Sequence, residues 1–64
     1  MFKLGFIVEI REPILIVSDE EGLETEIDLP DRNPRFWKRM RLILENDSFV
    51  EFDPIRKLLY QGVE

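Results

Sequence analysis

The segment Phe2-Lys3-Leu4-Gly5-Phe6-Ile7-Val8-Glu9-Ile10 decides the predicted fold, because apolar side chains recur in it at every second position. Such alternation is typical of a β-strand with one buried face. The more apolar set is predicted to face the core and consists of Phe2, Leu4, Phe6, Val8 and Ile10. The other positions of the segment are then predicted to face solvent. On this interpretation both phenylalanines are core residues and do not form an exposed binding surface.

Two further strands are predicted to continue the chain as an antiparallel meander. Pro13 favours a turn, and the run Ile14-Leu15-Ile16-Val17 is apolar throughout, which is typical of a strand covered on both faces. Residues 18–22 end in glycine and predict another turn. The third strand spans residues 23–29, where Leu23, Thr25, Ile27 and Leu29 alternate with Glu24, Glu26 and Asp28.

The next segment supports a helix but leaves a strand open. Residues 30–34 read Pro-Asp-Arg-Asn-Pro and end the third strand, because proline has no backbone N–H to donate. Asn33 and Pro34 are typical of the N-cap and first position of a helix. The predicted apolar side of that helix, within residues 34–45, consists of Phe36, Met40, Ile43 and Leu44. The alternative makes Lys38 to Glu45 a strand that leads into a hairpin turn.

The C-terminal part also allows two interpretations. Residues 49–52, Phe-Val-Glu-Phe, predict a fourth strand. Asp53 and Pro54 then either open a type I turn before a last strand at residues 58–63, or cap a helix over residues 54–61 that ends at Gly62.

A resemblance to a known family favours the turn. Gly5-Phe6-Ile7-Val8-Glu9-Ile10, the following apolar strand and the turn ending in Gly22-Leu23-Glu24 resemble the first three strands of an S1-type OB-fold domain. Phe49-Val50-Glu51-Phe52 and residues 53–60 are similar to the fourth strand, polar turn and closing strand of that family, and to its cold-shock relatives. The resemblance implies an all-β, five-stranded OB-like barrel with a short helix between strands three and four, and a face that binds RNA or single-stranded DNA. We expect residues 1–64 to form this one small domain, with an SH3-like small barrel as the alternative.

Composition limits the chemistry that this chain can perform. Its 64 residues include no cysteine and no histidine, which excludes disulfides and the usual zinc ligands. Its hydroxyl side chains have no base identifiable by motif, so we expect no catalysis, no cofactor, no metal site and no small-molecule substrate. No apolar run approaches the roughly 20 residues of a membrane span, and a cytoplasmic location without a membrane partner is expected.

Charge is distributed unevenly along this acidic chain, whose net charge is −5. Residues 1–31 carry two basic and nine acidic side chains, whereas residues 32–44 carry five basic and no acidic ones. The predicted nucleic-acid-binding residues are these five cations and the tryptophan among them: Arg32, Arg35, Trp37, Lys38, Arg39 and Arg41. On a helix, Trp37 is expected beside the cations and off the apolar stripe, where it can stack on a base.

Two alternatives stand beside this hypothesis. The cations can form surface ion pairs with Glu24, Glu26 and Asp28 while Trp37 covers one end of the barrel. The second alternative concerns function: a protein-interaction or regulatory subunit that docks on a larger partner or associates with a second copy.

Overall fold

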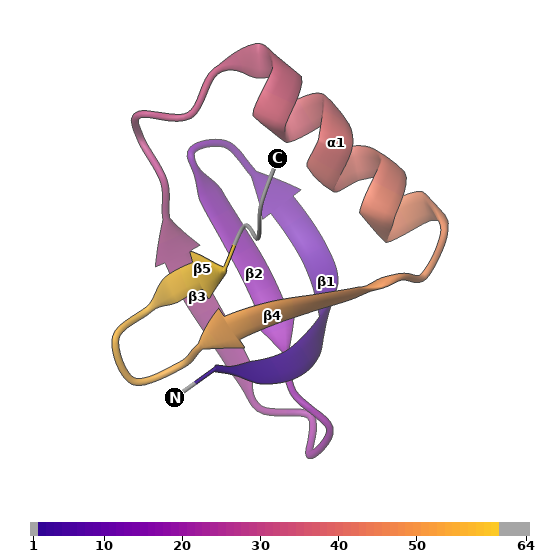
Figure 1. Cartoon of the computed structure of the whole chain (residues 1–64), viewed down its shortest axis with the longest axis vertical. Coiled ribbons are helices and arrows are strands. Elements are labelled where there is room, and N and C mark those ends of the chain that lie inside the picture. The colour runs from indigo at the N-terminus through magenta and orange to yellow at the C-terminus, as the bar shows by residue number, and fades with distance from the viewer. Residues whose placement is uncertain (1, 61–64) are drawn as a thin grey trace.

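The protein forms five antiparallel strands and one helix in a computed structural model that describes residues 2–60. The elements in chain order are β1 (Lys3–Arg11), β2 (Ile14–Ser18), β3 (Glu24–Asp28), α1 (Pro34–Glu45), β4 (Phe49–Asp53) and β5 (Leu58–Tyr60). The strands make one sheet in the order β3-β2-β1-β4-β5, and α1 packs across one side of it (Figure 1). The expected β-rich class, with a helix between the third and fourth strands, is confirmed.

The sheet is open, so the five strands predicted to form a small barrel do not close into one through the strand pairing of residues 2–60. Its two edges are β3 and β5, and no ladder joins them within that range. Closure would require β5 to run along β3, but the described part of β5 has three residues against five in β3. The sheet still curves strongly, because β1 pairs with β4 through its first half and with β2 through its second (Figure 1).

The predicted inward face of β1 is also wrong for most of the strand. Gly5 and Ile7 point into the core, whereas Phe2, Leu4, Phe6 and Val8 are exposed. The register shifts by one residue between Ile7 and Glu9, which marks a β-bulge, so that Ile10 packs against the core from the even-numbered set. The assumption of unbroken alternation therefore gave the correct face for Ile10, after the bulge, and the wrong face for the residues before it.

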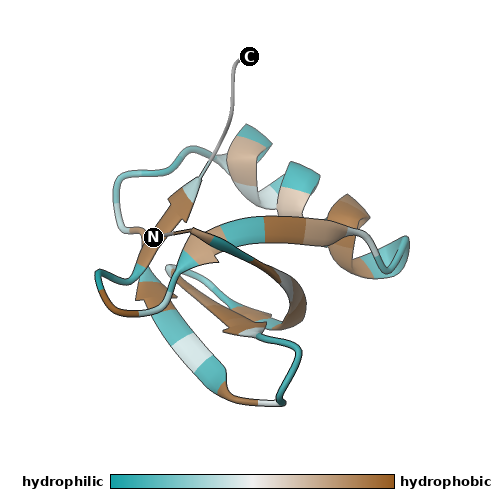
Figure 2. Ribbon diagram, turned by 60° about the horizontal axis from the view of Figure 1, so that its bottom comes forward, coloured by the Kyte–Doolittle hydropathy of each residue, from teal (hydrophilic) through white to brown (hydrophobic). Residues whose placement is uncertain are grey.

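The core lies between the inner face of the sheet and α1. Leu15, Val17, Ile27 and Phe52 are fully buried there, and Trp37 and Met40 contribute from the helix. Each fully buried side chain of this size contributes about 1.5–3 kcal/mol. Ile16, on the opposite face of β2 from Leu15 and Val17, is also buried. The prediction of a strand covered on both faces at residues 14–17 is therefore confirmed. Along β3, the inward residues Thr25 and Ile27 alternate with outward acidic residues, as expected (Figure 2).

Gly5 allows three elements to approach closely. A Cβ atom added there would lie 2.7 Å from the backbone oxygen of Ser18 and 3.0 Å from Val17, and would overlap the ring of Phe52. The hydrogen atom of glycine leaves room for the Phe52 ring against β1, which places this ring at the centre of the core.

The helix begins where the sequence predicts, and the strand alternative for residues 38–45 is wrong. Asn33 is the N-cap, and its Oδ1 accepts a hydrogen bond of 2.9 Å from the N–H of Phe36. Pro34 is the first helical residue. At the other end, the Nδ2 of Asn46 donates to the backbone oxygen of Leu42 at 2.9 Å, which satisfies one of the last carbonyl groups.

Two buried aspartates organise the turns at the ends of the sheet. Asp19 Oδ1 accepts from the N–H groups of Leu23 and Glu21, and its Oδ2 accepts from Lys3 Nζ at 3.2 Å. The Leu23 N–H is the largest cause of a lowered pKa for Asp19, with further lowering by Lys3 and Glu21 outweighing desolvation.

Asp53 plays the same part between β4 and β5. Its Oδ1 accepts from the N–H groups of Arg56 and Ile55, and the Arg56 bond is the main cause of a lowered pKa for Asp53. The predicted turn followed by a last strand is therefore confirmed as far as Tyr60, and the helix alternative for this segment is wrong. The rest of the predicted strand, residues 61–63, lies outside the described residues.

Candidate nucleic-acid interface

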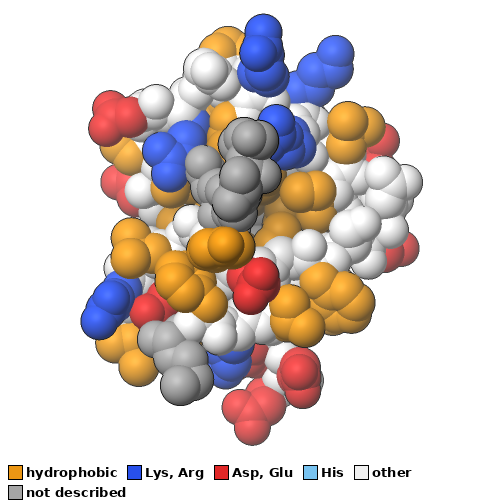
Figure 3. Space-filling model, in the orientation of Figure 1, with side chains coloured by type: hydrophobic (Ala, Val, Ile, Leu, Met, Phe, Trp, Pro, Cys, Tyr) orange, Lys and Arg blue, Asp and Glu red, His pale blue; other side chains and the backbone are white. Residues whose placement is uncertain are grey.

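The cations of the basic segment lie on and just before α1. Arg35 and Lys38 are exposed on the helix, and blue side chains gather over its N-terminal half in Figure 3. Arg39, one turn after Arg35, lines a cavity beside the helix. No acidic residue lies in the first turn of α1.

Arg32 and Arg41 contact other side chains on the protein surface. The guanidinium of Arg32 lies over the ring of Phe36, 5.4 Å from its centroid. Arg41 forms an ion pair with Glu12, in the turn between β1 and β2. Within residues 2–60 no ion pair joins the basic segment to the acidic face of β3, so the predicted pairs with Glu24, Glu26 and Asp28 are not formed.

Trp37 does not lie among the exposed cations, and this expectation is wrong. Its side chain is 3% exposed and belongs to the core, beside Met40. The spacing of three residues places the two side chains on the same side of the helix. Phe36, predicted as a core residue, is only half-buried and packs edge-on against Trp37. The indole therefore has a packing role and is not available to stack on a base.

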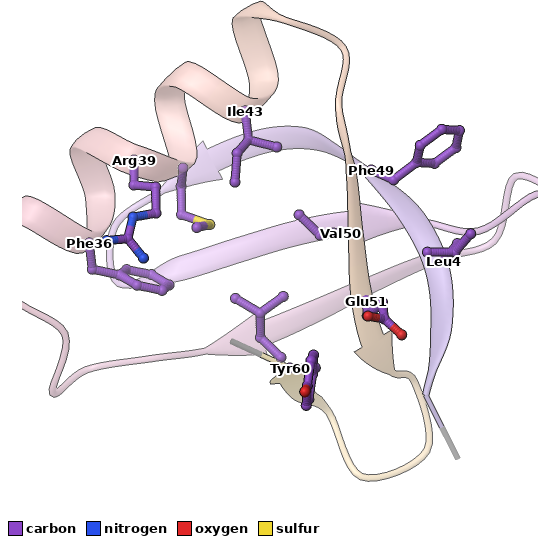
Figure 4. Close-up of a pocket in the computed structure, with 10 residues that line it drawn as sticks. Leu4, Phe36, Arg39, Ile43, Phe49, Val50, Glu51 and Tyr60 are labelled. Carbon is purple, nitrogen blue, oxygen red and sulfur yellow. The ribbon is translucent and has the colours of Figure 1, made fainter. Parts of the chain in front are cut away.

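A groove lies between α1 and the pair β4–β5, and sequence reasoning did not find it (Figure 4). Its volume is about 340 Å³, within the usual range of small-molecule sites. Phe36 and Arg39 line it from the helix, Phe49 and Glu51 from β4, and Tyr60 from β5. Apolar side chains of the same elements and of β1 complete the lining.

Exposed aromatic rings extend from this groove over the outer face of the sheet. Phe49 is 60% exposed and packs against Phe6, with ring centroids 4.6 Å apart. Tyr60 is 49% exposed and packs against Phe2 at 5.4 Å. The glycine at position 5 was the available signal for this face, because a strand glycine often marks a close approach on its own side.

The cations outside the helix have different surroundings. Lys3 forms an ion pair with the buried carboxylate of Asp19, and Arg56 lies 3.8 Å from Asp53. Neither these groups nor the acidic face of β3 belongs to the groove. The positive charge beside the groove therefore comes from α1.

Residues 2–60 contain neither a candidate metal-binding cluster nor a candidate membrane-spanning helix. That part of the chain contains no group of three or more acidic side chains placed to hold a metal ion. It also contains no helix with the length and hydrophobicity needed to span a membrane. Comparison of the chain with protein-family models, curated proteins and solved structures finds no match.

Proposed function

We propose that this protein binds single-stranded nucleic acid in the groove between α1 and β4–β5. The observation that carries the proposal is the combination, in one groove, of aromatic walls with a cationic helix. Proteins that bind single strands combine a positive groove that follows the backbone with aromatic rings on which bases stack. Each stacked base contributes about 1–3 kcal/mol in such sites.

The stacking surfaces are Phe36, Phe49 and Tyr60, in place of Trp37. All three line the groove from three different elements, so a base can enter between the helix and the strands. Phe2 and Phe6 extend the aromatic surface along β1. A strand of several nucleotides then follows the path from α1 over β5 to the outer face of the sheet.

The phosphate contacts are assigned to Arg35, Lys38 and Arg39. Arg35 and Lys38 project from the exposed side of α1, next to the groove that Arg39 lines. The exposed acidic side chains of β3 repel phosphate, so the backbone is directed towards the helix. This arrangement lets a protein of net charge −5 offer a local site to a polyanion.

The fold supports an OB-like classification within this proposal. The OB-fold is a five-stranded, partly open Greek-key barrel. An open five-stranded sheet with a helix between β3 and β4 agrees with that description. The proposed site is nevertheless on the helix side of the sheet, whereas OB-folds bind through the face of their second and third strands.

A titration of labelled oligonucleotides tests the proposal. Fluorescence anisotropy with single-stranded RNA and DNA is measured at several salt concentrations between about 50 and 200 mM. The double variant R35Q/K38Q is expected to weaken binding and to lower the slope of log affinity against log salt by roughly 1.4, because two phosphate contacts are lost. R56Q and K57Q together remove the same charge from the β4–β5 turn and serve as the matched control. Absence of binding to any oligonucleotide at the lowest salt would overturn the proposal.

A second candidate function is self-association through the outer face of β1. Phe2, Leu4, Phe6 and Val8 form an exposed strip without a charged side chain among them. A second copy presents the same uncharged strip, so a two-fold arrangement buries both at once. Sedimentation at increasing concentration tests this candidate, and the variant F6E should remain monomeric where the parent protein associates.

A further inference from the structure

The strand β3 is an edge of the sheet, and its hydrogen bonds to β2 show which of its backbone groups face outwards. At one end of the β2–β3 ladder, the N–H of Leu29 donates to the oxygen of Pro13 at 2.8 Å. At the other end, the N–H of Asp19 donates to the oxygen of Leu23 at 3.1 Å. Both bonds continue the register of the ladder and join odd-numbered residues. The odd-numbered residues of β3 are therefore the ones whose backbone groups bond to β2, because bonded and non-bonded pairs alternate in an antiparallel ladder.

The even-numbered residues of β3 then direct their backbone N–H and C=O groups towards the free edge. These residues are Glu24, Glu26 and Asp28, and their side chains are exposed, whereas those of Thr25 and Ile27 are buried. Among the residues that the structure describes, none of the three carboxylates takes part in an ion pair. Each residue that offers backbone groups to a further strand thus also offers a negative charge.

We propose that β3 binds, as an added antiparallel strand, an extended segment of a partner protein with lysine or arginine at every second position. When a strand is added to a sheet edge, main-chain hydrogen bonds supply affinity and alternate side chains supply specificity. In antiparallel pairing, the residue that bonds to the backbone of Glu26 stands directly opposite it, with its side chain on the same outward face. Each cation of the partner then lies beside one carboxylate. The inference is independent of the nucleic-acid site, which lies at α1 and β4–β5.

The charge of β3 disfavours a second copy of this chain as the occupant. Pairing of two β3 edges would bring carboxylates together on one face, and like charges across a strand pair are destabilising. The other edge, β5, exposes Leu58 and Tyr60 and carries no cation from residue 58 to residue 60. A cationic strand from another protein is therefore the occupant that charge complementarity favours.

Synthetic peptides of about seven residues test the proposal, because this length covers the five residues of β3. The first peptide alternates lysine with threonine, which has a high β propensity. The second has the same composition with its lysines in one block, and the third carries glutamate in place of lysine. NMR titration of the labelled protein measures the dissociation constant of each. The alternating lysine peptide is expected to bind several-fold more tightly than the blocked one, and the glutamate peptide is expected not to bind.

Methylation of the peptide nitrogens tests the backbone ladder separately from the charge. The lysine amides are predicted to donate to β3, whereas the threonine amides point away from it. N-methylation of the lysine amides is therefore expected to abolish binding, and N-methylation of the threonine amides to preserve it. In the complex, the amides of Glu24, Glu26 and Asp28 should gain protection from hydrogen exchange. The amides of Thr25 and Ile27 should already be protected in the free protein.

A double variant of β3 tests the contribution of the carboxylates. E24Q/E26Q removes two negative charges, and it is expected to weaken binding of the alternating lysine peptide by roughly 2- to 30-fold, the range of two cross-strand charge pairs. E45Q/D47N removes the same charge at the end of α1 and in the connection to β4, and should leave this affinity unchanged.

Three results would overturn the proposal. The first is equal affinity for the alternating and the blocked peptide, or no binding of either. The second is binding that survives N-methylation of the lysine amides. The third is protection of the Glu26 amide in the free protein that rises with protein concentration, because it would assign the edge to a second copy.

Discussion

The indole ring of Trp37 packs edge-on against the ring of Phe36, with their centroids 5.0 Å apart and their planes at 87°. These two consecutive residues of α1 therefore have different environments. Trp37 lies in the core, whereas Phe36 forms part of the groove wall. The helix therefore contributes to the stability of the domain through Trp37 and to the wall of the proposed binding site through Phe36.

Replacement of Trp37 by alanine is expected to lower the free energy of unfolding by about 3–5 kcal/mol, because it leaves a large cavity between α1 and the sheet. Urea denaturation monitored by circular dichroism measures this loss. The conservative variant W37F should remain folded and bind oligonucleotides as the parent protein does. A folded W37F protein without affinity would show that the indole contacts the ligand.

Replacement of Gly5 by alanine is expected to destabilise the protein by about 1–3 kcal/mol through overpacking. The added methyl group meets the ring of Phe52 and the backbone oxygen of Ser18. Thermal unfolding of G5A and of the double variant G5A/F52L checks the cause. Because the Ser18 oxygen belongs to the backbone, the smaller side chain at position 52 should not restore the parent melting temperature.

The Asp19 turn is expected to make stability depend on pH. The pKa of Asp19 is lowered below its ordinary value of 3.8 in the folded protein, so its contribution is fully present above that value. The contribution is lost as the pH falls through the folded-state pKa. The urea midpoint of D19N should therefore lie below that of the parent at pH 7, and the difference should shrink in acid.

A variant of the ion-pair partner separates the causes of this effect. K3Q removes the cation and keeps the hydrogen bond from the Leu23 N–H, the largest cause of the lowered pKa. It should therefore reproduce only part of the D19N effect at pH 7. An equal loss of stability in K3Q and D19N would contradict the larger contribution of the Leu23 hydrogen bond.

Loss of the N-cap at Asn33 is expected to reduce stability by about 1 kcal/mol. In N33A the N–H of Phe36 loses its side-chain acceptor at the start of α1. N33S retains an acceptor and should lie close to the parent protein in urea denaturation. If N33A and N33S are equally stable, the cap does not contribute in the expected way.

Truncation of Phe52 in the core and of Phe6 on the outer face of β1 should have different effects on stability. F52A removes a fully buried ring and should cost about 3–5 kcal/mol. Phe6 is 38% exposed, so F6A should cost clearly less. Equal losses in the two variants, measured by chemical denaturation, would place Phe6 in the core, as alternation had predicted.

Local signals in the sequence were reliable where the chemistry is local. Asn33 and Pro34 predicted the start of α1, and Asp53 and Pro54 predicted the turn before β5. These features depend on hydrogen bonds between residues close in the chain. The packing side of each element was less predictable, because it depends on partners that are distant in sequence. Trp37 and Phe6 were both assigned to the wrong environment for this reason.

Of the candidate site, only the cluster of positive charges could be predicted from the sequence. A cluster of cations between residues 32 and 41 is visible in the sequence, and the structure places several of them on α1 beside the groove. The groove itself joins Phe36 to Tyr60, which are 24 positions apart in the numbering of the chain. Periodicity carries no information about such a pairing, since it follows from the strand order and from the faces that β4 and β5 turn towards the helix.

The bulge at Val8 divides β1 into two halves. Before the bulge the odd-numbered residues face the core, and after it the even-numbered Ile10 does. One extra residue thus turns Ile10 inward, on the opposite side of the strand from Phe6. With unbroken alternation, the second half of the strand would direct Glu9 and Arg11 towards the interior and would supply no apolar side chain to it.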